Sequence, residues 1–345
     1  MTERMEETIE SIWKTIEEKV KQGSYADKRV YQRLDLERET GIRLGVIAPG
    51  DIRELLIQLT PIDKTDFTPP KWVGMRFEII MLDVPDKGTR HIRLYLNKPE
   101  HRNVFTMVCA NIVNTLLEVL KPEHRTVQLL ACLEKWTHFF RKHGIEGLSK
   151  EAQRGLFGEI SWLQKLLTAG MDECKVIESW HGCRRGYHDF EFGGKIVEVK
   201  TTISKEPRRV RINNEKQLDD RGFDELFLYV LTLHPSFSGG QRLPDLINAI
   251  RSRLISNIAA KELFEQLLQD SGYLDVHEVL YDDGYIVKIE EVFQIRKGFP
   301  RIIDLPSGTG DISYSLIISA CSGFLVDLDD AINVFLGGEQ IGRSL

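Results

Sequence analysis

The feature that most limits how this chain can fold is a glycine pair, Gly193-Gly194, between two runs of alternating polar and apolar residues. Such a pair is typical of a two-residue β-hairpin turn, which needs the positive φ angles that glycine adopts without strain. The turn sets the strand register, so we expect Asp189 to lie opposite Glu198. Side chains alternate between the two faces of a strand, so Lys200 shares the face of Glu198. The hairpin therefore gathers two carboxylates and an amine.

This hairpin predicts a metal site. Two carboxylates that face each other across a hairpin have Cβ atoms roughly 5 Å apart and repel each other. Mg²⁺ or Mn²⁺ would offset the repulsion, because such hard cations take oxygen ligands from one or two carboxylates and keep several waters. We therefore expect Asp189 and Glu198 to bind the metal, with the backbone carbonyl of Val199 as a further ligand. Lys200 would orient or help to deprotonate a metal-bound water, or stabilise charge in the transition state.

A solvated strand face is the simpler interpretation of the same pattern. Alternating charged residues on a strand usually point into water, and this accounts well for Glu191 and Lys195. It accounts less well for a cluster of charged side chains that converges in front of apolar ones. On the opposite face of the predicted hairpin lie three apolar residues: Phe190, Val197 and Val199.

A helix is predicted before the hairpin, from about Lys150 to Leu167, with Ser149 as its N-cap and Gly170 as its stop signal. Glu159 falls at the border of the apolar stripe of this helix. If the helix packs on the hairpin, Glu159 joins the carboxylates there. From the helix alone, an ordinary glutamate at the edge of an amphipathic face is favoured. The stripe consists of Leu156, Ile160, Leu163 and Leu167.

The rest of the chain predicts an α/β fold in two parts. After residue 149 the order is helix, hairpin, strand (224–233), helical segment (243–270) and strand-like runs, which favours a mixed sheet layered with helices. Before residue 100 the chain is β-rich, with an N-terminal helix. We therefore divide the chain into an N-terminal α+β accessory region, 1–145, and a second domain, 146–345. The N-terminal region contains predicted helices at 5–21, 103–120 and 125–142 and β-rich runs within 41–96.

These segments resemble the PD-(D/E)XK nuclease superfamily. The resemblance covers about residues 148–330 and is closest to the PD-(D/E)XK motif proteins of bacterial restriction-type and phage-defence gene clusters. It implies a restriction-endonuclease-like core, in which helices flank a mixed sheet. The segments that carry it are 155–159 (Gly-Leu-Phe-Gly-Glu), 180–182 (Trp-His-Gly), 188–190 (His-Asp-Phe), 197–202 (Val-Glu-Val-Lys-Thr-Thr) and 310–314 (Gly-Asp-Ile-Ser-Tyr).

By position, the resemblance assigns the motif Asp to Asp189, the D/E to Glu198, the X to Val199 and the Lys to Lys200. The sequence departs from the motif at one place, because His188 stands where a proline would precede the Asp. The departure makes the motif less specific, and the catalytic interpretation is less affected because members often lack that proline.

Two further residues match the family. Glu159 matches the helical acid that many members place before the hairpin, where it would assist a metal-bound water or a second metal. Gln217 resembles the glutamine that some members supply after the lysine strand; an ordinary polar helix residue is about as good an interpretation of Gln217.

The segment 200–216 is the most basic in the chain, and we predict that Arg208, Arg209 and Arg211 contact nucleic-acid phosphates. Arg184 and Arg185 could add to this surface. The alternative is a solvated loop whose arginines pair with acids elsewhere. The formal net charge is −6, so any nucleic-acid surface must be a local patch.

The remaining sequence excludes other classes of protein. No apolar run of about 18 residues indicates a membrane span, and the acidic N-terminus does not resemble a secretory signal, so we expect a cytoplasmic protein. Five cysteines without CxxC spacing argue against disulfides and zinc, and the phosphate-binding GxxxxGK[ST] motif is missing.

Two functions remain. The first is a Mg²⁺- or Mn²⁺-dependent DNA endonuclease or nickase of a bacterial restriction or antiphage system, with DNA, other defence proteins or a second copy of itself as partners. The second is a non-catalytic DNA-binding or scaffold subunit with the same fold.

Overall fold

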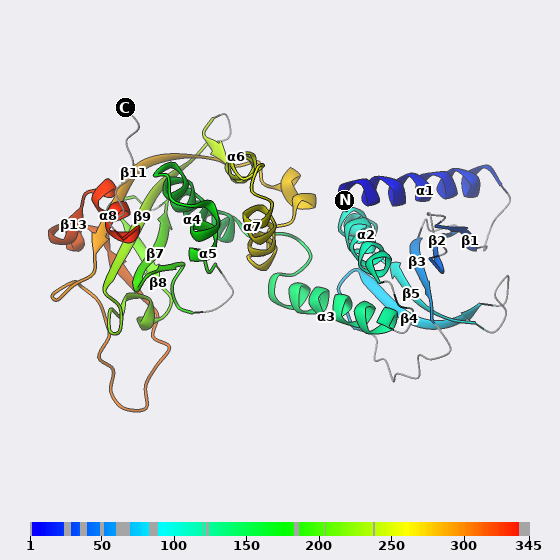
Figure 1. The fold of residues 1–345 in the computed structure, drawn as a ribbon, viewed down its shortest axis with the longest axis horizontal. Helices are drawn as coiled ribbons and strands as arrows, with labels where there is room; N and C mark the ends of the chain where they lie inside the picture. The colour runs from blue at the N-terminus through cyan, green and yellow to red at the C-terminus, as the bar shows by residue number, and fades with distance from the viewer. Residues whose placement is uncertain are drawn as a thin grey trace. The chain divides into compact units, whose positions relative to one another are not determined.

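The computed structural model describes residues 2–23, 29–34, 40–48, 52–59, 70–82, 89–119, 121, 124–182, 186–203, 205–236 and 239–337. They divide into two compact units, Met1–Glu146 and Gly147–Leu345, each with its own sheet and helices (Figure 1). The predicted α/β fold is confirmed, with a β-rich N-terminal region and a mixed sheet flanked by helices.

The first unit contains a five-stranded antiparallel sheet with the strand order β1-β2-β3-β5-β4. Its strands are β1 (Arg29–Arg33), β2 (Ile42–Ile47), β3 (Ile52–Gln58), β4 (Met75–Leu82) and β5 (Thr89–Leu96). Its helices are α1 (Thr2–Gln22), η1 (Pro99–His101), α2 (Arg102–Glu118) and α3 (Arg125–His143).

Aromatic packing and a buried ion pair join α1 to the rest of this unit. Trp13 of α1 stacks on Phe105 of α2, with 5.3 Å between the ring centroids. Arg53 of β3 is only 1 % exposed, and its guanidinium donates to Glu10 and Glu17 of α1 at 2.5 to 2.9 Å. Because an arginine can be buried only when its charge is paired, α1 is held to the sheet by polar as well as apolar contacts.

The second unit contains a mixed sheet with the strand order β10-β11-β9-β7-β6. β7 and β9 are parallel, and the other described pairings in this sheet are antiparallel. Its strands are β6 (Phe190–Phe192), β7 (Lys195–Thr202), β9 (Glu225–Ser236), β10 (Gln241–Arg242), β11 (Gly284–Gln294) and β13 (Leu325–Val326), which pairs with β11. A separate two-stranded ribbon pairs β8 (Arg209–Ile212) with β12 (Tyr314–Ile317).

The described part of the second unit also contains α-helices and short 3-10 helices. The α-helices are α4 (Lys150–Thr168), α5 (Glu173–Ser179), α6 (Leu243–Arg253), α7 (Ile258–Asp270) and α8 (Leu328–Phe335). The 3-10 helices are η3 (Glu215–Leu218), η4 (Asp275–Leu280) and η5 (Ile318–Phe324).

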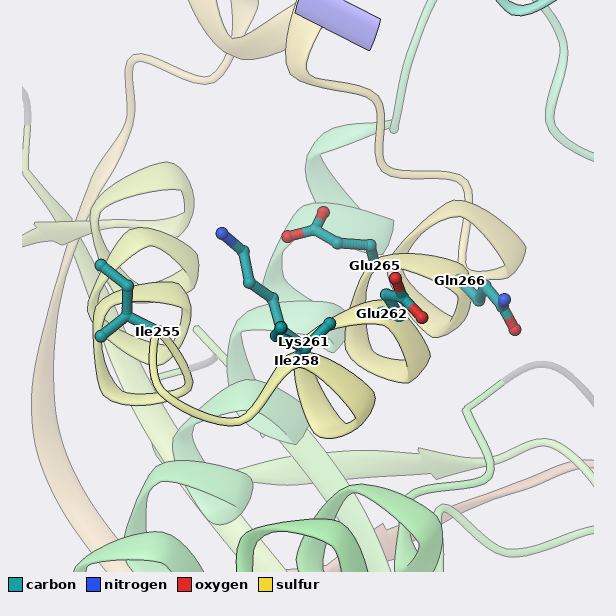
Figure 2. A pocket seen from close by; sticks show the side chains of 6 residues that line it. All are labelled: Ile255, Ile258, Lys261, Glu262, Glu265 and Gln266. Carbon is teal, nitrogen blue, oxygen red and sulfur yellow. The ribbon is translucent and has the colours of Figure 1, made fainter. Parts of the chain in front are cut away.

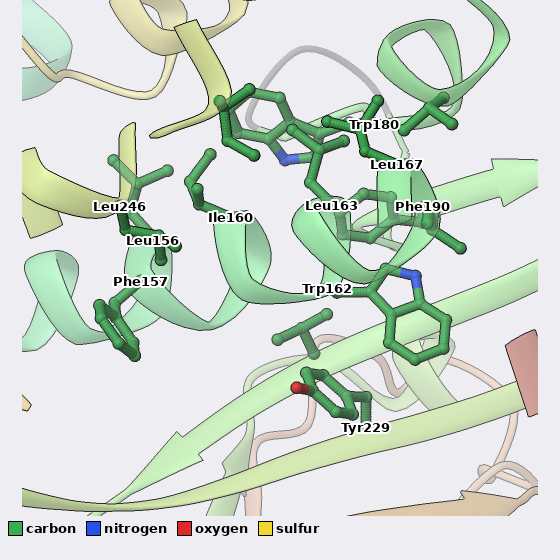
Figure 3. Packing of buried hydrophobic residues seen from close by; sticks show 14 of the residues in the cluster. Leu156, Phe157, Ile160, Trp162, Leu163, Leu167, Trp180, Phe190, Tyr229 and Leu246 are labelled. Atoms are coloured by element: carbon green, nitrogen blue, oxygen red, sulfur yellow. The ribbon is translucent and has the colours of Figure 1, made fainter. Parts of the chain in front are cut away.

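The sheet of the second unit has an apolar core on each face. Neighbouring residues of β9 belong to different cores. Tyr229 packs in the core between the sheet and the α-helices, and Leu228 packs in the core between the sheet, the ribbon and η5. On the helix side, the predicted apolar stripe of α4 packs toward Trp180, Phe190 and Tyr229 (Figure 3). Two periodicities, 3.6 residues in α4 and 2 residues in β9, therefore produce a three-layered unit.

A glycine sets how closely α4 approaches β7. A Cβ atom added to Gly158 would lie 2.6 Å from Cγ2 of Thr201 and 3.1 Å from Cγ1 of Val199. Only a residue without a side chain allows this separation, which brings the next residue, Glu159, toward the β7 strand. Ser149 caps α4 as predicted, because its hydroxyl oxygen accepts from the backbone N–H of Ala152.

The strand-like run near the C-terminus differs from the prediction. Only Tyr314–Ile317 and Leu325–Val326 are strands, and the residues between them form the 3-10 helix η5. Its buried residues Ile318 and Cys321 are three positions apart, and a 3-10 helix places such residues on one side. The helical segment 243–270 is also divided, with α6 and α7 separated by a turn at 254–257.

Candidate active site

The predicted hairpin register is confirmed. Phe190 pairs with Val197 and Phe192 with Lys195 across a turn in which Gly193 and Gly194 have φ angles of +56° and +77°. These positive angles are the reason for glycine at both positions.

Asp189 lies just before β6, and its side chain turns toward β7. Its Oδ2 atom accepts from the backbone N–H of Val199 at 2.8 Å. Its backbone carbonyl accepts from the N–H of His181 at 2.9 Å. Asp189 is thus held at both its main chain and its side chain, beside the strand that carries Glu198 and Lys200.

Glu198 is completely buried and forms an ion pair with Lys200. One carboxylate oxygen, Oε1, accepts from Nζ of Lys200, and the other, Oε2, has no hydrogen-bond partner among the described residues. Lys200 is 14 % exposed at its side chain. An unpaired buried carboxylate oxygen is costly, so this atom points to a ligand or water that the protein's own groups do not replace.

Glu159 joins the same group from α4. Its Oε2 atom accepts from the indole N–H of Trp180 at 2.8 Å, and its charge interacts with those of Asp189 and Lys200. Trp180 is 1 % exposed and pairs with Phe190 in an isolated β-bridge, so the hydrogen-bond donor to Glu159 is fixed at the sheet edge. We call Glu159, Asp189 and Glu198, with Lys200 beside them, the carboxylate cluster.

The carboxylate cluster contains more negative charge than its lysine offsets. Burial and repulsion by Asp189 raise the pKa of Glu159 to about 8, and the same two causes raise the pKa of Glu198 well above its usual range. Burial also raises the pKa of Asp189, although Lys200 and the Val199 N–H oppose this. Burial lowers the pKa of Lys200, but Glu198 and Asp189 outweigh it and the net shift is upward.

These features fit a hard divalent cation. The cluster offers carboxylate oxygens, one of them unpaired, and its charge would be balanced by a dication. In the described residues, no three His, Cys, Asp or Glu side chains are grouped closely enough to hold a metal by themselves. The donors would therefore be Asp189, Glu198 and the Val199 carbonyl, with waters completing the coordination, as Mg²⁺ allows.

Gln217 is not brought into the carboxylate cluster by any described contact. It lies in η3, half-buried, and its side-chain oxygen accepts from the backbone N–H of Asn213 at 2.8 Å. The structure thus gives Gln217 a local capping contact, which agrees with its interpretation as an ordinary polar residue.

The three predicted phosphate contacts differ in their surroundings. The guanidinium of Arg208 is largely buried and is ion-paired with Glu291, with a further contact to Thr232 at 3.2 Å. Arg209 and Arg211 lie on the exposed side of β8, and Arg211 donates to Ser313 at 3.0 Å. Arg208 is therefore paired with an acid, as the alternative to phosphate binding predicts. The side chains of Arg209 and Arg211 face solvent.

Arg184, Arg185 and Cys183 lie outside the described residues.

A surface hollow lies on α7 and the turn before it, lined by Ile255, Ile258, Lys261, Glu262, Glu265 and Gln266 (Figure 2). It includes no predicted site residue, so the candidate chemistry lies in the carboxylate cluster.

A family model described as "Putative PD-(D/E)XK family member, (DUF4420)" matches residues 9–319. The chain belongs to this family. Membership of the PD-(D/E)XK family gives it a nuclease-type fold, and the match extends over both compact units. Comparisons with curated proteins and with solved structures found no match. In the part of the chain that the structure describes, no helix combines the length and apolar character needed to cross a membrane.

Trp180 is the residue of the candidate site whose contact with Glu159 the sequence did not reveal. The segment Trp180-His181-Gly182 contributes to the resemblance, but nothing in the sequence predicts that the indole donates to Glu159. The two residues are 21 positions apart, and only the packing of α4 beside the sheet edge brings them together.

Proposed function

We propose that this PD-(D/E)XK family protein hydrolyses DNA phosphodiester bonds with a divalent metal ion, as an endonuclease or nickase. One observation carries the proposal: Asp189, Glu198 and Lys200 converge, and Glu198 keeps an unpaired oxygen among them. A role in a bacterial restriction or antiphage system, in the cytoplasm, is supported by the narrower sequence resemblance.

The proposed mechanism assigns a task to each side chain. Asp189, Glu198 and the carbonyl of Val199 would hold the metal, which when bound would polarise the phosphate and acidify a water. Asp189 is kept in place by the Val199 N–H, so its other carboxylate oxygen has a fixed direction. Lys200 holds its ammonium beside Glu198, where it would bind the attacking water or a phosphate oxygen.

Glu159 and Trp180 would support the residues that hold the metal. The indole N–H fixes one oxygen of Glu159 and leaves the other to accept from a water. Glu159 would then orient a water of the metal or assist a second metal, as the resemblance implies. Trp180 would act through Glu159, to which its indole donates, and is therefore a positioning residue.

The test is cleavage of supercoiled plasmid by the purified full chain with Mg²⁺ or Mn²⁺. We expect nicking or linearisation that EDTA abolishes and that Lys200→Ala lowers at least about 100-fold. The matched control is Lys195→Ala, which removes a lysine at the hairpin turn of the same strand, and should leave cleavage unchanged.

A second measurement, the unfolding midpoint with and without Mn²⁺, tests whether the folded protein binds a metal even when it does not cleave the plasmid. A divalent cation that binds the native state raises the unfolding midpoint. Mn²⁺ should therefore stabilise the wild type but not Glu198→Gln. If Mn²⁺ stabilises both variants equally and no plasmid is cut, the proposal is wrong and the non-catalytic DNA-binding or scaffold subunit becomes the better interpretation.

A further inference from the structure

Tyr187 is an exposed aromatic residue next to the carboxylate cluster. It is 47 % exposed, and no other Phe, Tyr or Trp in the described part of the chain is exposed to this extent. It precedes Asp189 by two positions. An exposed ring two positions before Asp189 is available to stack on a flat ligand group.

A lysine accompanies this ring. Nζ of Lys216 donates to the hydroxyl of Tyr187 at 2.8 Å and lies 4.5 Å from the ring centroid. Since the ammonium is nearer to the hydroxyl than to the centroid, it lies toward the hydroxyl end of the ring. The pair therefore combines an exposed aromatic side chain with an exposed positive charge at its hydroxyl end.

His188, the residue after Tyr187, fixes the position of this segment. The half-buried ring of His188 hydrogen-bonds with the backbone of Lys216 and packs edge-to-face on Phe223, with 5.3 Å between the centroids. The contacts of His188 therefore hold Tyr187 beside η3. The position of Tyr187 does not rest only on its hydrogen bond with Lys216.

The 3-10 helix η3 is fixed in turn. Asn214 caps it and also donates to Asp311 at 3.0 Å, while Glu215 accepts from the N–H of Ile312 at 2.8 Å. Leu218 of η3 belongs to the same apolar core as Ile196 of β7. Ile196 shares its strand face with Glu198 and Lys200, so Tyr187 and Lys216 are mounted on the side of the sheet from which these site residues project.

We propose that Tyr187 stacks on an unpaired nucleobase and that Lys216 binds the neighbouring phosphate, so that the substrate is single-stranded or locally unpaired beside the scissile bond. The proposal rests on the proposed function for its substrate class. A ring face next to a single positive charge matches a nucleotide, which presents a flat base and a phosphate. In duplex DNA the bases are stacked on one another, so their faces are not open to such a ring.

The test measures binding of the full chain in EDTA, so that cleavage plays no part. Anisotropy would compare a fluorescein-labelled oligothymidylate with a duplex of the same length. We expect tighter binding of the single strand, lost about tenfold or more in Tyr187→Ala. Tyr187→Phe should stay within about threefold of the wild type, because the ring remains. Lys216→Ala should lower the dependence of log affinity on log salt by about one.

A fluorescent base gives a direct readout of stacking. Quenching of 2-aminopurine in the single strand should occur with the wild type and with Tyr187→Phe, and should be relieved in Tyr187→Leu, which keeps apolar bulk but has no ring. Ile258→Ala, which truncates an exposed apolar side chain on α7, is the matched control and should change nothing.

The outcomes separate this inference from the proposed hydrolysis. Equal loss of single-strand and duplex binding in Tyr187→Ala, no loss of either, or no binding by the wild type overturns the inference. Metal-dependent plasmid cleavage with unchanged single-strand affinity in Tyr187→Ala overturns the inference and leaves hydrolysis standing. Quenching that depends on Tyr187 without any cleavage supports the inference and removes the hydrolysis.

Discussion

Asp189 illustrates at the residue scale how a site can oppose the stability of its own fold. Its charge raises the pKa of both other carboxylates in the cluster, and burial raises its own. A folded-state pKa above the usual value means that the ionised form is destabilised at neutral pH. Stability is therefore sacrificed at this position in a manner typical of functional sites.

We therefore predict that Asp189→Asn stabilises the protein in EDTA. The amide oxygen retains the bond from the Val199 N–H, and the repulsion with Glu159 and Glu198 disappears, for a gain of about 1 kcal/mol in the free energy of unfolding. Urea denaturation measures the change. The same variant should lose metal-dependent cleavage, and a destabilised variant would contradict the prediction.

Arg208 gives a second prediction at this scale. Because its guanidinium is ion-paired with Glu291 and largely buried, Arg208→Ala should lower the free energy of unfolding by about 1–3 kcal/mol. Arg211→Ala, which removes an exposed arginine three positions further along the chain, should change stability by no more than about 0.5 kcal/mol. Denaturation curves of the two variants provide the comparison; equal stabilities would contradict the assigned ion pair.

The residues of the site could be predicted from sequence where they are local. The glycine turn fixes how Asp189, Glu198 and Lys200 are arranged, because all three lie within one hairpin. The partner of Arg208 could not be predicted, since Glu291 is 83 positions away. A local excess of arginine looks the same in the sequence whether its charge is free or paired.

At the scale of elements, the contact between α4 and β7 depends on Gly158. We predict that Gly158→Ala lowers the free energy of unfolding by about 1–3 kcal/mol, because the new methyl meets a short, branched side chain, Thr201, at 2.6 Å. Displacement of α4 would also move Glu159 and reduce cleavage. Urea denaturation and the plasmid assay measure the two effects.

Gly155 of the same helix is the matched control. A Cβ atom there meets nothing within 4 Å, so Gly155→Ala should stabilise the protein by about 0.5–1 kcal/mol through helix propensity alone. If both substitutions have the same sign, close packing is not the reason for Gly158.

Elements with a long, clear period could be predicted, and short ones could not. The 19 residues of α4 contain a full apolar stripe and a serine cap. By contrast, α5 has only 7 residues and η5 replaces what the sequence predicts as a strand. Apolar runs of a few residues do not distinguish a strand from a helical turn, and tertiary packing decides between them.

At the scale of the whole molecule, two units with separate sheets should unfold separately. We predict two transitions in calorimetry. Arg53→Met, which leaves Glu10 and Glu17 without their buried cation, should shift one transition, at a loss of about 3 kcal/mol. Gly158→Ala should shift only the other. A single transition that moves with both substitutions would show that the units unfold together.

Acid should also affect the first unit through Glu10. The hydrogen bonds from Arg53 lower the pKa of Glu10 below its ordinary value of 4.5, although burial opposes this. The stabilisation is therefore fully present above about pH 4.5 and is lost as the pH falls through the lower folded-state value. The transition assigned by Arg53→Met should lose this part of its acid sensitivity in that variant.

The pairing of β8 with β12 has a consequence for the order in which the protein is made. The ribosome releases β8 soon after Lys200, but β12 emerges only after α6, α7 and β11 have been synthesised. The segment Asp311–Ser313, which contacts Asn214, Glu215 and Arg211, emerges equally late. A nascent chain thus carries Asp189, Glu198 and Lys200 long before the partners of β8 and η3 exist, so under the proposed function DNA cutting would wait until synthesis is nearly finished.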